Sequence, residues 1–153
     1  MPGRPFSSLW GMSKSIDILV VDDNEDDLNL TLMALRKLGL SGEIAVCRDG
    51  QEALDFLFGT GPFAGKDISL PKLILLDIKL PKVDGFEVLK KVKTDERTKN
   101  LLVVMLSSSS RKSDLTSSYS AGANSYLVKS VDFRQFTEDI AQLGRYWLGL
   151  NRT

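Results

Sequence analysis

The sequence predicts an α/β domain built on a doubly wound, five-stranded parallel sheet with five helices. Short apolar segments alternate along the chain with segments whose apolar residues recur at helical spacing. Three of the apolar segments have no polar face, as parallel strands do when helices cover both sides of the sheet. The 153 residues, of which 42% are hydrophobic and 26% charged, suit one globular domain of this class.

The first half of the chain contains two strand patterns, each followed by a helix pattern. The apolar segment Ile16–Val21 predicts the first strand, and the leucines of Asp26–Leu38 recur at helical spacing until Gly39 ends the pattern. Glu43–Cys47 predicts the second strand, and Gly50–Phe58 has its apolar residues on one side of a second helix. Residues 1–15 show no periodicity and are expected to form a flexible leader, so the folded domain is expected to span residues 16–150.

The second half continues the alternation with three strands and three helices. Its first two strand segments are apolar throughout, and its helices carry apolar residues at spacings of three and four. The fourth helix is serine-rich and has the weakest pattern. The expected elements are, in chain order, Leu73–Leu76, Gly85–Lys93, Leu101–Leu106, Ser113–Ala121, Ser125–Val128 and Asp132–Leu148.

Composition excludes several functions. Twenty basic and 20 acidic residues give a formal net charge of zero, so the chain lacks the positive field of a nucleic-acid-binding protein. The absence of histidine and the single cysteine, Cys47, exclude catalysis by an internal imidazole and Cys-x-x-Cys metal sites. No apolar segment reaches the ~18 residues of a membrane helix. We therefore expect a cytoplasmic protein with neither a nucleic-acid nor a membrane partner.

Polar residues stand where four of the predicted strands end: Asp22 and Asp23, Asp77, Ser107, and Lys129. Because ligands bind beyond the carboxyl ends of parallel strands, these residues are expected to form one site. Two carboxylates 4 Å apart repel each other by about 4 kcal/mol at an effective dielectric constant of ~20, so three of them require a cation. Carboxylate oxygens suit Mg²⁺, and an aspartate can act as a phosphoryl acceptor. The pattern predicts metal-assisted phosphoryl transfer to an aspartate.

Simpler interpretations of the same residues exist. The acidic segment Asp22–Asp27 is also typical of a solvated helix N-terminus, and Asp77 could cap a turn. A calcium-binding EF-hand loop starting at Asp22 would need glycine and glutamate where Asp27 and Met33 stand, so that motif is absent. The turn after the first strand also lacks the glycines of a dinucleotide-binding fold.

The sequence resembles the receiver domains of response regulators in two-component signalling. The acidic pair lies in VVDDN, Asp77 in LILLDIKLPKVDG, Ser107 in VVMLSSS, and Tyr126 with Lys129 in SYLVKS. The resemblance covers about residues 16–148 and implies a flavodoxin-like fold of the receiver type.

A closer resemblance is to single-domain response regulators associated with phytochrome-type kinases. It depends on the long segment Gly59–Lys72 before the third strand and on the aromatic tail RYWLGL. Only 24 residues follow Lys129, which leaves room for one helix, so we expect signalling by protein binding and no enzymatic output domain.

The resemblance implies a role for each site residue. Asp77 would accept a phosphoryl group from a partner histidine kinase, and the chain would catalyse only its own phosphoryl transfer and dephosphorylation. Mg²⁺ would be bound by Asp23, Asp77 and the backbone carbonyl of Lys79, with Asp22 acting largely through a water molecule. Ser107 and Lys129 would bind phosphoryl oxygens.

Two further expectations follow from the resemblance. Tyr126 would rotate inward when Ser107 moves, which would change the surface of the fourth helix and fifth strand. The family usually has proline after the lysine, in a bond that is typically cis, whereas here Ser130 follows Lys129. A cis bond before a residue other than proline costs ~2.5–4 kcal/mol, so the Lys129–Ser130 bond is expected to be either strained or trans.

The last helix suggests self-association. Its apolar residues recur at spacings of three and four and are expected to cover the sheet: Phe133, Phe136, Ile140, Leu143 and Trp147. The tail adds Tyr146, Leu148 and Leu150, which is more apolar surface than one helix face can bury. In receiver domains, which the sequence resembles, the common dimer face is formed by the fourth helix, fifth strand and fifth helix. The resemblance therefore implies a homodimer through these three elements. The alternative function is a pseudo-receiver, a constitutive interaction module that keeps the fold without the chemistry.

Overall fold

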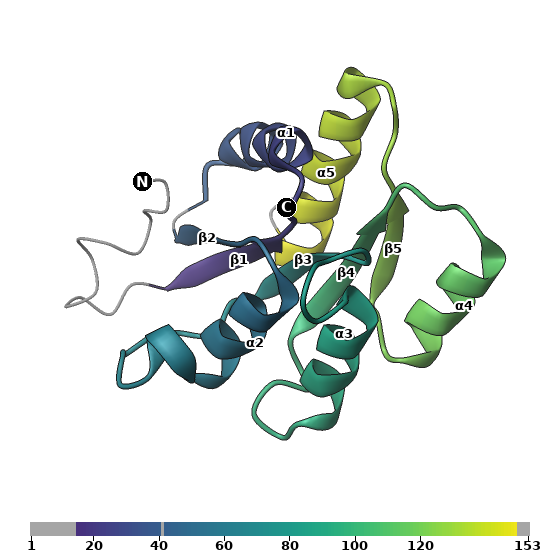
Figure 1. Ribbon diagram of the computed structural model, residues 1–153. Helices are drawn as coiled ribbons and strands as arrows, with labels where there is room; N and C mark the ends of the chain where they lie inside the picture. Colours follow the sequence, from purple (N-terminus) through teal and green to yellow (C-terminus); the bar gives the residue numbers. More distant parts are fainter. Residues whose placement is uncertain (1–14, 41, 150–153) are drawn as a thin grey trace.

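The computed structural model of the chain describes residues 15–40 and 42–149 and contains one five-stranded parallel sheet (Figure 1). The strands are β1 (Ile16–Val21), β2 (Glu43–Cys47), β3 (Leu73–Asp77), β4 (Leu102–Ser107) and β5 (Ser125–Val128). The helices are α1 (Glu25–Arg36), α2 (Gly50–Phe58), the short 3₁₀ helix η2 (Gly61–Phe63), α3 (Gly85–Thr94), α4 (Lys112–Ser120) and α5 (Phe133–Leu148). All ten predicted strands and helices are confirmed, with bounds that differ by one or two residues at most.

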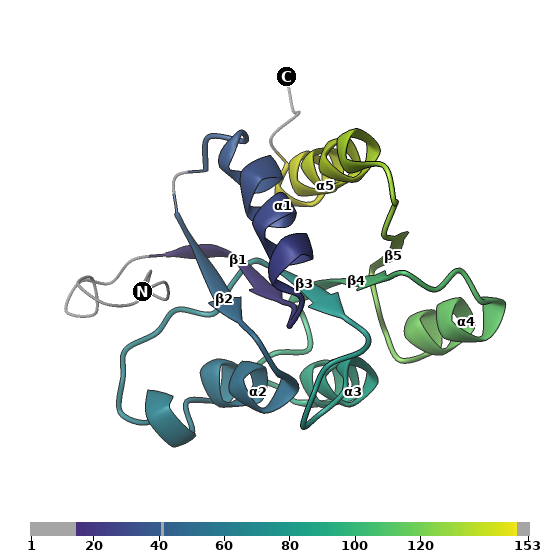
Figure 2. The same ribbon diagram turned by 45° about the horizontal axis from the view of Figure 1, so that its top comes forward.

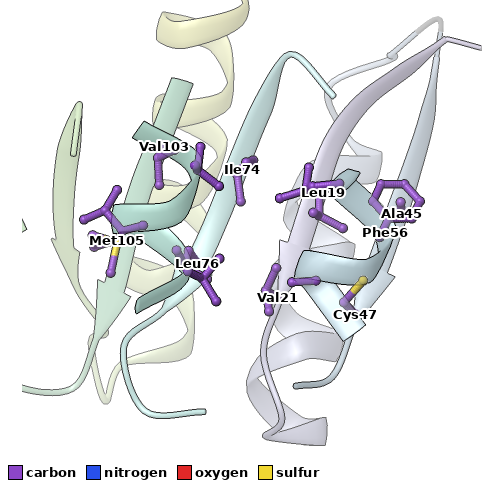
Figure 3. Close-up of a cluster of buried hydrophobic side chains, with 14 of the residues drawn as sticks. Leu19, Val21, Ala45, Cys47, Phe56, Ile74, Leu76, Val103 and Met105 are labelled. Carbon is purple, nitrogen blue, oxygen red and sulfur yellow. The ribbon is translucent and has the colours of Figure 1, made fainter. Parts of the chain in front are cut away.

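The sheet has the strand order β2-β1-β3-β4-β5 and carries helices on both faces, so the doubly wound prediction is confirmed. Helices α1 and α5 cover one face, and α2 and α3 cover the other, with α4 beside α3 next to the β5 edge (Figure 2). The three central strands therefore bury both of their faces. On the α2 and α3 side, Leu19, Ile74 and Met105 belong to one apolar cluster (Figure 3).

Side-chain caps explain where four of the five α-helices begin. Asn24, Asp49, Asp84 and Asp132 each precede a helix and accept a hydrogen bond from a backbone N–H of its first turn. Helix α4 follows Arg111 without such a bond, and its only buried residue is Ser118. The weak sequence pattern of this segment thus corresponds to the helix that is least well anchored.

Helix α5 departs from the prediction at its N-terminal end. Phe136 and Ile140 are buried against the sheet as expected, but the side chain of Phe133 is 70% exposed. Trp147 is half-buried, packs against the apolar cluster beneath α5 and donates a hydrogen bond from Nε1 to the Ser125 hydroxyl at 3.2 Å. The neighbouring Tyr146 is 72% exposed.

The predictions for the two ends of the chain fall partly outside the described residues. The predicted leader, apart from Ser15, and Leu150 of the tail lie outside the described residues. Within residues 15–40 and 42–149, no helix combines the length and the apolar character needed to cross a membrane.

Candidate functional site

Three aspartates meet at the carboxyl edge of the sheet. Asp22 follows the last residue of β1, and Asp77 is the last residue of the neighbouring strand β3. Asp22 is fully buried, Asp77 is buried and Asp23 is exposed. Each offers a carboxylate oxygen, and these oxygens lie within 4.8 Å of one another. The predicted convergence of the three acidic residues is therefore found in the structure.

Lys129 reaches into the same site from the end of β5. Its ammonium nitrogen lies 3.1 Å from Asp22 Oδ2, 3.1 Å from Asp77 Oδ2 and 2.9 Å from Asp27 Oδ2. An ammonium group has three N–H donors, so three different carboxylates account for all of them. The peptide bonds of the described residues are trans, and this includes the bond between Lys129 and Ser130.

Asp27 is the residue of this site that sequence reasoning missed. It lies in the first turn of α1, where the acidic segment had an ordinary explanation in the helix dipole. An acidic side chain three residues after a helix cap often bonds the backbone N–H of the cap residue. Here the N–H of the cap residue Asn24 donates to Asp22 Oδ1 at 3.0 Å instead. The carboxylate of Asp27 contacts Lys129.

Backbone amides orient the two buried carboxylates. Besides the Asn24 N–H on Asp22, the backbone N–H of Lys79 donates to Asp77 Oδ1 at 3.3 Å. Each buried carboxylate thus has one oxygen on a backbone amide and the other on the Lys129 ammonium. Lys79, in the loop after β3, is exposed and lies next to the site through its N–H on Asp77.

The electrostatics of the site indicate a missing positive charge. Burial raises the pKa of Asp22 to about 6, against the effects of Lys129 and the Asn24 N–H and with the help of the Asp77 charge. Burial also acts to lower the pKa of Lys129, but the charges of Asp22 and Asp77 outweigh it and raise that pKa above its usual range. The ammonium therefore stays charged, and this one cation contacts three carboxylates, while the carboxylate of Asp23 lies beside two of them.

The donor set fits a divalent cation with a preference for oxygen ligands. Asp22, Asp23 and Asp77 supply three carboxylates within reach of one ion, and no softer ligand takes part. Mg²⁺ is bound in proteins by one or two carboxylates while it keeps several waters and contacts phosphate oxygens. A dication would also favour the ionised form of Asp22, whose pKa is raised by burial and, to a lesser extent, by the Asp77 charge.

Ser107 and Tyr126 lie on the β4 and β5 side of this edge. Ser107 is buried at the end of β4; its hydroxyl accepts a hydrogen bond from the Ser109 N–H at 3.0 Å. Tyr126 of β5 donates from its hydroxyl to the Ser109 carbonyl at 2.9 Å. The backbone N–H of Lys129 donates to the Ser107 carbonyl at 2.7 Å. Ser109 thus links the hydroxyls of Ser107 and Tyr126.

Comparison with known proteins identifies the class to which this fold and site belong. The family model described as the response regulator receiver domain matches residues 18–141. The chain therefore belongs to the response regulator receiver domains, which are signalling domains and not conventional enzymes.

More particularly, the chain is similar to phytochrome-associated response regulators. It shares 37% identity and a TM-score of 0.83 with the phosphorylated cyanobacterial phytochrome response regulator RcpA, over 89% of this chain and 96% of that one. The Mn²⁺-bound form of response regulator Rcp1, which is known from Synechocystis sp., has 34% identity and a TM-score of 0.81, over 87% and 94% of the two chains. A probable methanogenesis regulatory protein, FilR2 of Methanothrix harundinacea, is 42% identical over 89% of this chain and 86% of its own length.

Proposed function

We propose that this chain is a response regulator that accepts a phosphoryl group on Asp77 and signals through phosphorylation-dependent protein binding. The observation that carries the proposal is the position of the Asp77 carboxylate. It lies 3.1 Å from the Lys129 ammonium and within 4.8 Å of oxygens of Asp22 and Asp23. A carboxylate in this setting has both a cation for the incoming phosphoryl oxygens and a set of metal ligands beside it.

The transfer step follows from these positions. An oxygen of Asp77 attacks the phosphorus of a phosphohistidine, an O–P bond forms, and the P–N bond breaks with its electron pair returning to the imidazole. Lys129 exchanges its contact with Asp77 for one with a phosphoryl oxygen, and the Ser107 hydroxyl binds another. Asp22, Asp23, Asp77 and the carbonyl of Lys79 would hold Mg²⁺. When bound, this ion stabilises negative charge on the phosphoryl oxygens.

The phosphodonor is a partner histidine kinase. The 153 residues contain no histidine, so the donor imidazole belongs to another protein. Similarity to RcpA, a cyanobacterial phytochrome response regulator, supports a phytochrome-type kinase. The buried, free thiol of Cys47 supports a reducing compartment, and we place this exchange in the cytoplasm.

Asp22, Asp23, Asp77, Ser107 and Lys129 are the phosphoryl-site residues of this proposal, and their presence favours it over a pseudo-receiver. Switching would begin at Ser107 and reach the β5 surface through Ser109 and Tyr126. The Ser109 N–H donates to the Ser107 hydroxyl, and the Tyr126 hydroxyl donates to the Ser109 carbonyl. A pseudo-receiver would need none of these polar contacts at the carboxyl edge.

Mg²⁺ should stabilise the fold and permit binding of the phosphoryl mimic beryllofluoride. At a tenfold excess over the dissociation constant, a ligand stabilises the native state by about 1.4 kcal/mol, or roughly 3–6 °C in a domain of this size. Thermal unfolding at millimolar Mg²⁺, with and without beryllofluoride, measures both effects. A melting temperature that neither additive changes would support the pseudo-receiver and refute the proposed function.

The proposal includes a homodimer through α4, β5 and α5. Apolar side chains are exposed along these elements and the loop between them: Tyr119, Val128, Val131, Phe133 and Tyr146. Val131 is 99% exposed, and exposed apolar groups of this kind mark contact surfaces. Phosphorylation would change the dimer affinity because the Tyr126 link ends beneath this surface.

Phe133→Glu should weaken the dimer by at least ~10-fold, since it places a charge where an apolar contact is expected. Sedimentation at micromolar concentrations, with and without beryllofluoride, is the measurement. Met33→Glu is the matched control because Met33 is an exposed apolar residue of α1, outside the proposed face. A wild-type protein that is monomeric under both conditions would refute the homodimer and make this face a docking site for another partner.

A further inference from the structure

We propose that Asp27 is a positioning residue that receives the Lys129 ammonium when Mg²⁺ binds. The inference rests on the proposed function, because it concerns how the metal and the lysine share the same carboxylates. The ion pair between Lys129 Nζ and Asp27 Oδ2 is 2.9 Å long, and the side chain of Lys129 is only 11% exposed.

Lys129 competes with a cation for the oxygens of the metal site. Its ammonium contacts Oδ2 of Asp22 and Oδ2 of Asp77, both of which belong to the group of carboxylates able to hold an ion. A dication at these oxygens repels the ammonium, so Lys129 must give up at least one contact. A buried ammonium without a carboxylate partner is costly.

Asp27 is the one partner of Lys129 that the ion would leave in place. Its carboxylate contacts the ammonium but does not belong to the group of Asp22, Asp23 and Asp77. The first turn of α1 is fixed, because the Asn24 side chain accepts the N–H of Asp27 at 3.0 Å. Lys129 can therefore withdraw from the metal ligands and keep an anionic partner, which leaves it beside Asp77 for the phosphoryl oxygens.

The test is a double-mutant cycle between Asp27→Asn and Lys129→Gln, with Mg²⁺ binding measured by calorimetry. In the wild-type background, Asp27→Asn should weaken Mg²⁺ binding about 10-fold, the lower range for a hydrogen bond between charged groups. In the Lys129→Gln background the competing ammonium is gone, so the same substitution should change the affinity by no more than ~2-fold.

Asp26→Asn provides the matched control. Asp26 is exposed on the same turn of α1, so its substitution removes the same charge one residue nearer the start of the helix. It should change Mg²⁺ affinity by less than ~2-fold in both backgrounds. Asp27→Glu keeps a carboxylate and should restore most of the affinity, and thermal unfolding will show that each variant folds.

Two outcomes would overturn the inference. An equal or larger loss from Asp27→Asn in the Lys129→Gln background would show that Asp27 acts on the ion directly. Equal effects of Asp27→Asn and Asp26→Asn on the Mg²⁺ affinity would show that Asp27 contributes only a general negative charge. A wild-type protein that binds no Mg²⁺ would instead refute the proposed function.

Discussion

Asp77→Asn is expected to abolish phosphorylation of the chain. The asparagine amide has nearly the same shape as the carboxylate but lacks a nucleophilic oxygen, and loss of a nucleophile lowers rates by at least ~1,000-fold. The substitution also removes one carboxylate of the metal group and one partner of Lys129. Intact-mass spectrometry after incubation with a small phosphodonor and Mg²⁺ measures the result as the mass of one added phosphoryl group.

Asp26→Asn serves as the control for this experiment too. It makes the same chemical change on an exposed side chain outside the metal group, so it should accept a phosphoryl group as the wild type does. If Asp77→Asn is labelled at the wild-type rate, the acceptor is another residue, and the proposed role of Asp77 is wrong. If it binds no phosphoryl group but still binds Mg²⁺ weakly, the metal site has been separated from the acceptor.

The sheet and the main site residues could be predicted because both depend on local patterns. An apolar segment that stops at Asp22, Asp77 or Lys129 indicates where a strand ends, and parallel topology brings strand ends to one edge. The sequence therefore indicated which side chains would meet without any knowledge of their distances. Asn24 and Asp84, which cap α1 and α3 in the structure, are residue types that favour helix starts and could have refined the predicted bounds.

Asp27 and Phe133 could not be predicted in this way. The role of Asp27 depends on which carboxylate accepts the hydrogen bond from the Asn24 N–H. In the structure the acceptor is Asp22, which lies outside the helix. Phe133 has the right spacing to face the sheet, but spacing does not show where the sheet ends. Helix α5 begins beyond the carboxyl edge of β5, so its first residue has no strand beneath it (Figure 1). Both cases depend on the relative placement of whole elements.

Gly50→Ala is expected to destabilise the fold by about 3 kcal/mol, the upper range for overpacking, or roughly 6–12 °C. A Cβ atom at Gly50 would lie 1.7 Å from the backbone oxygen of Val83. The backbone at Gly50 or at Val83 would have to move to relieve this clash. The start of α2 is also tied to this loop by a hydrogen bond from the Gly50 N–H to the Pro81 carbonyl at 3.3 Å.

The clash decides the sign of this effect against helix propensity. Within a helix, alanine is about 1 kcal/mol more favourable than glycine, so propensity alone predicts a more stable variant. Thermal unfolding distinguishes the two, with Gln51→Ala at the next, exposed position as a control that should change stability by less than ~0.5 kcal/mol. A Gly50→Ala variant as stable as the wild type would mean that the loop can move. Because this loop also carries Lys79, whose amide orients Asp77, a displaced loop should weaken Mg²⁺ binding as well.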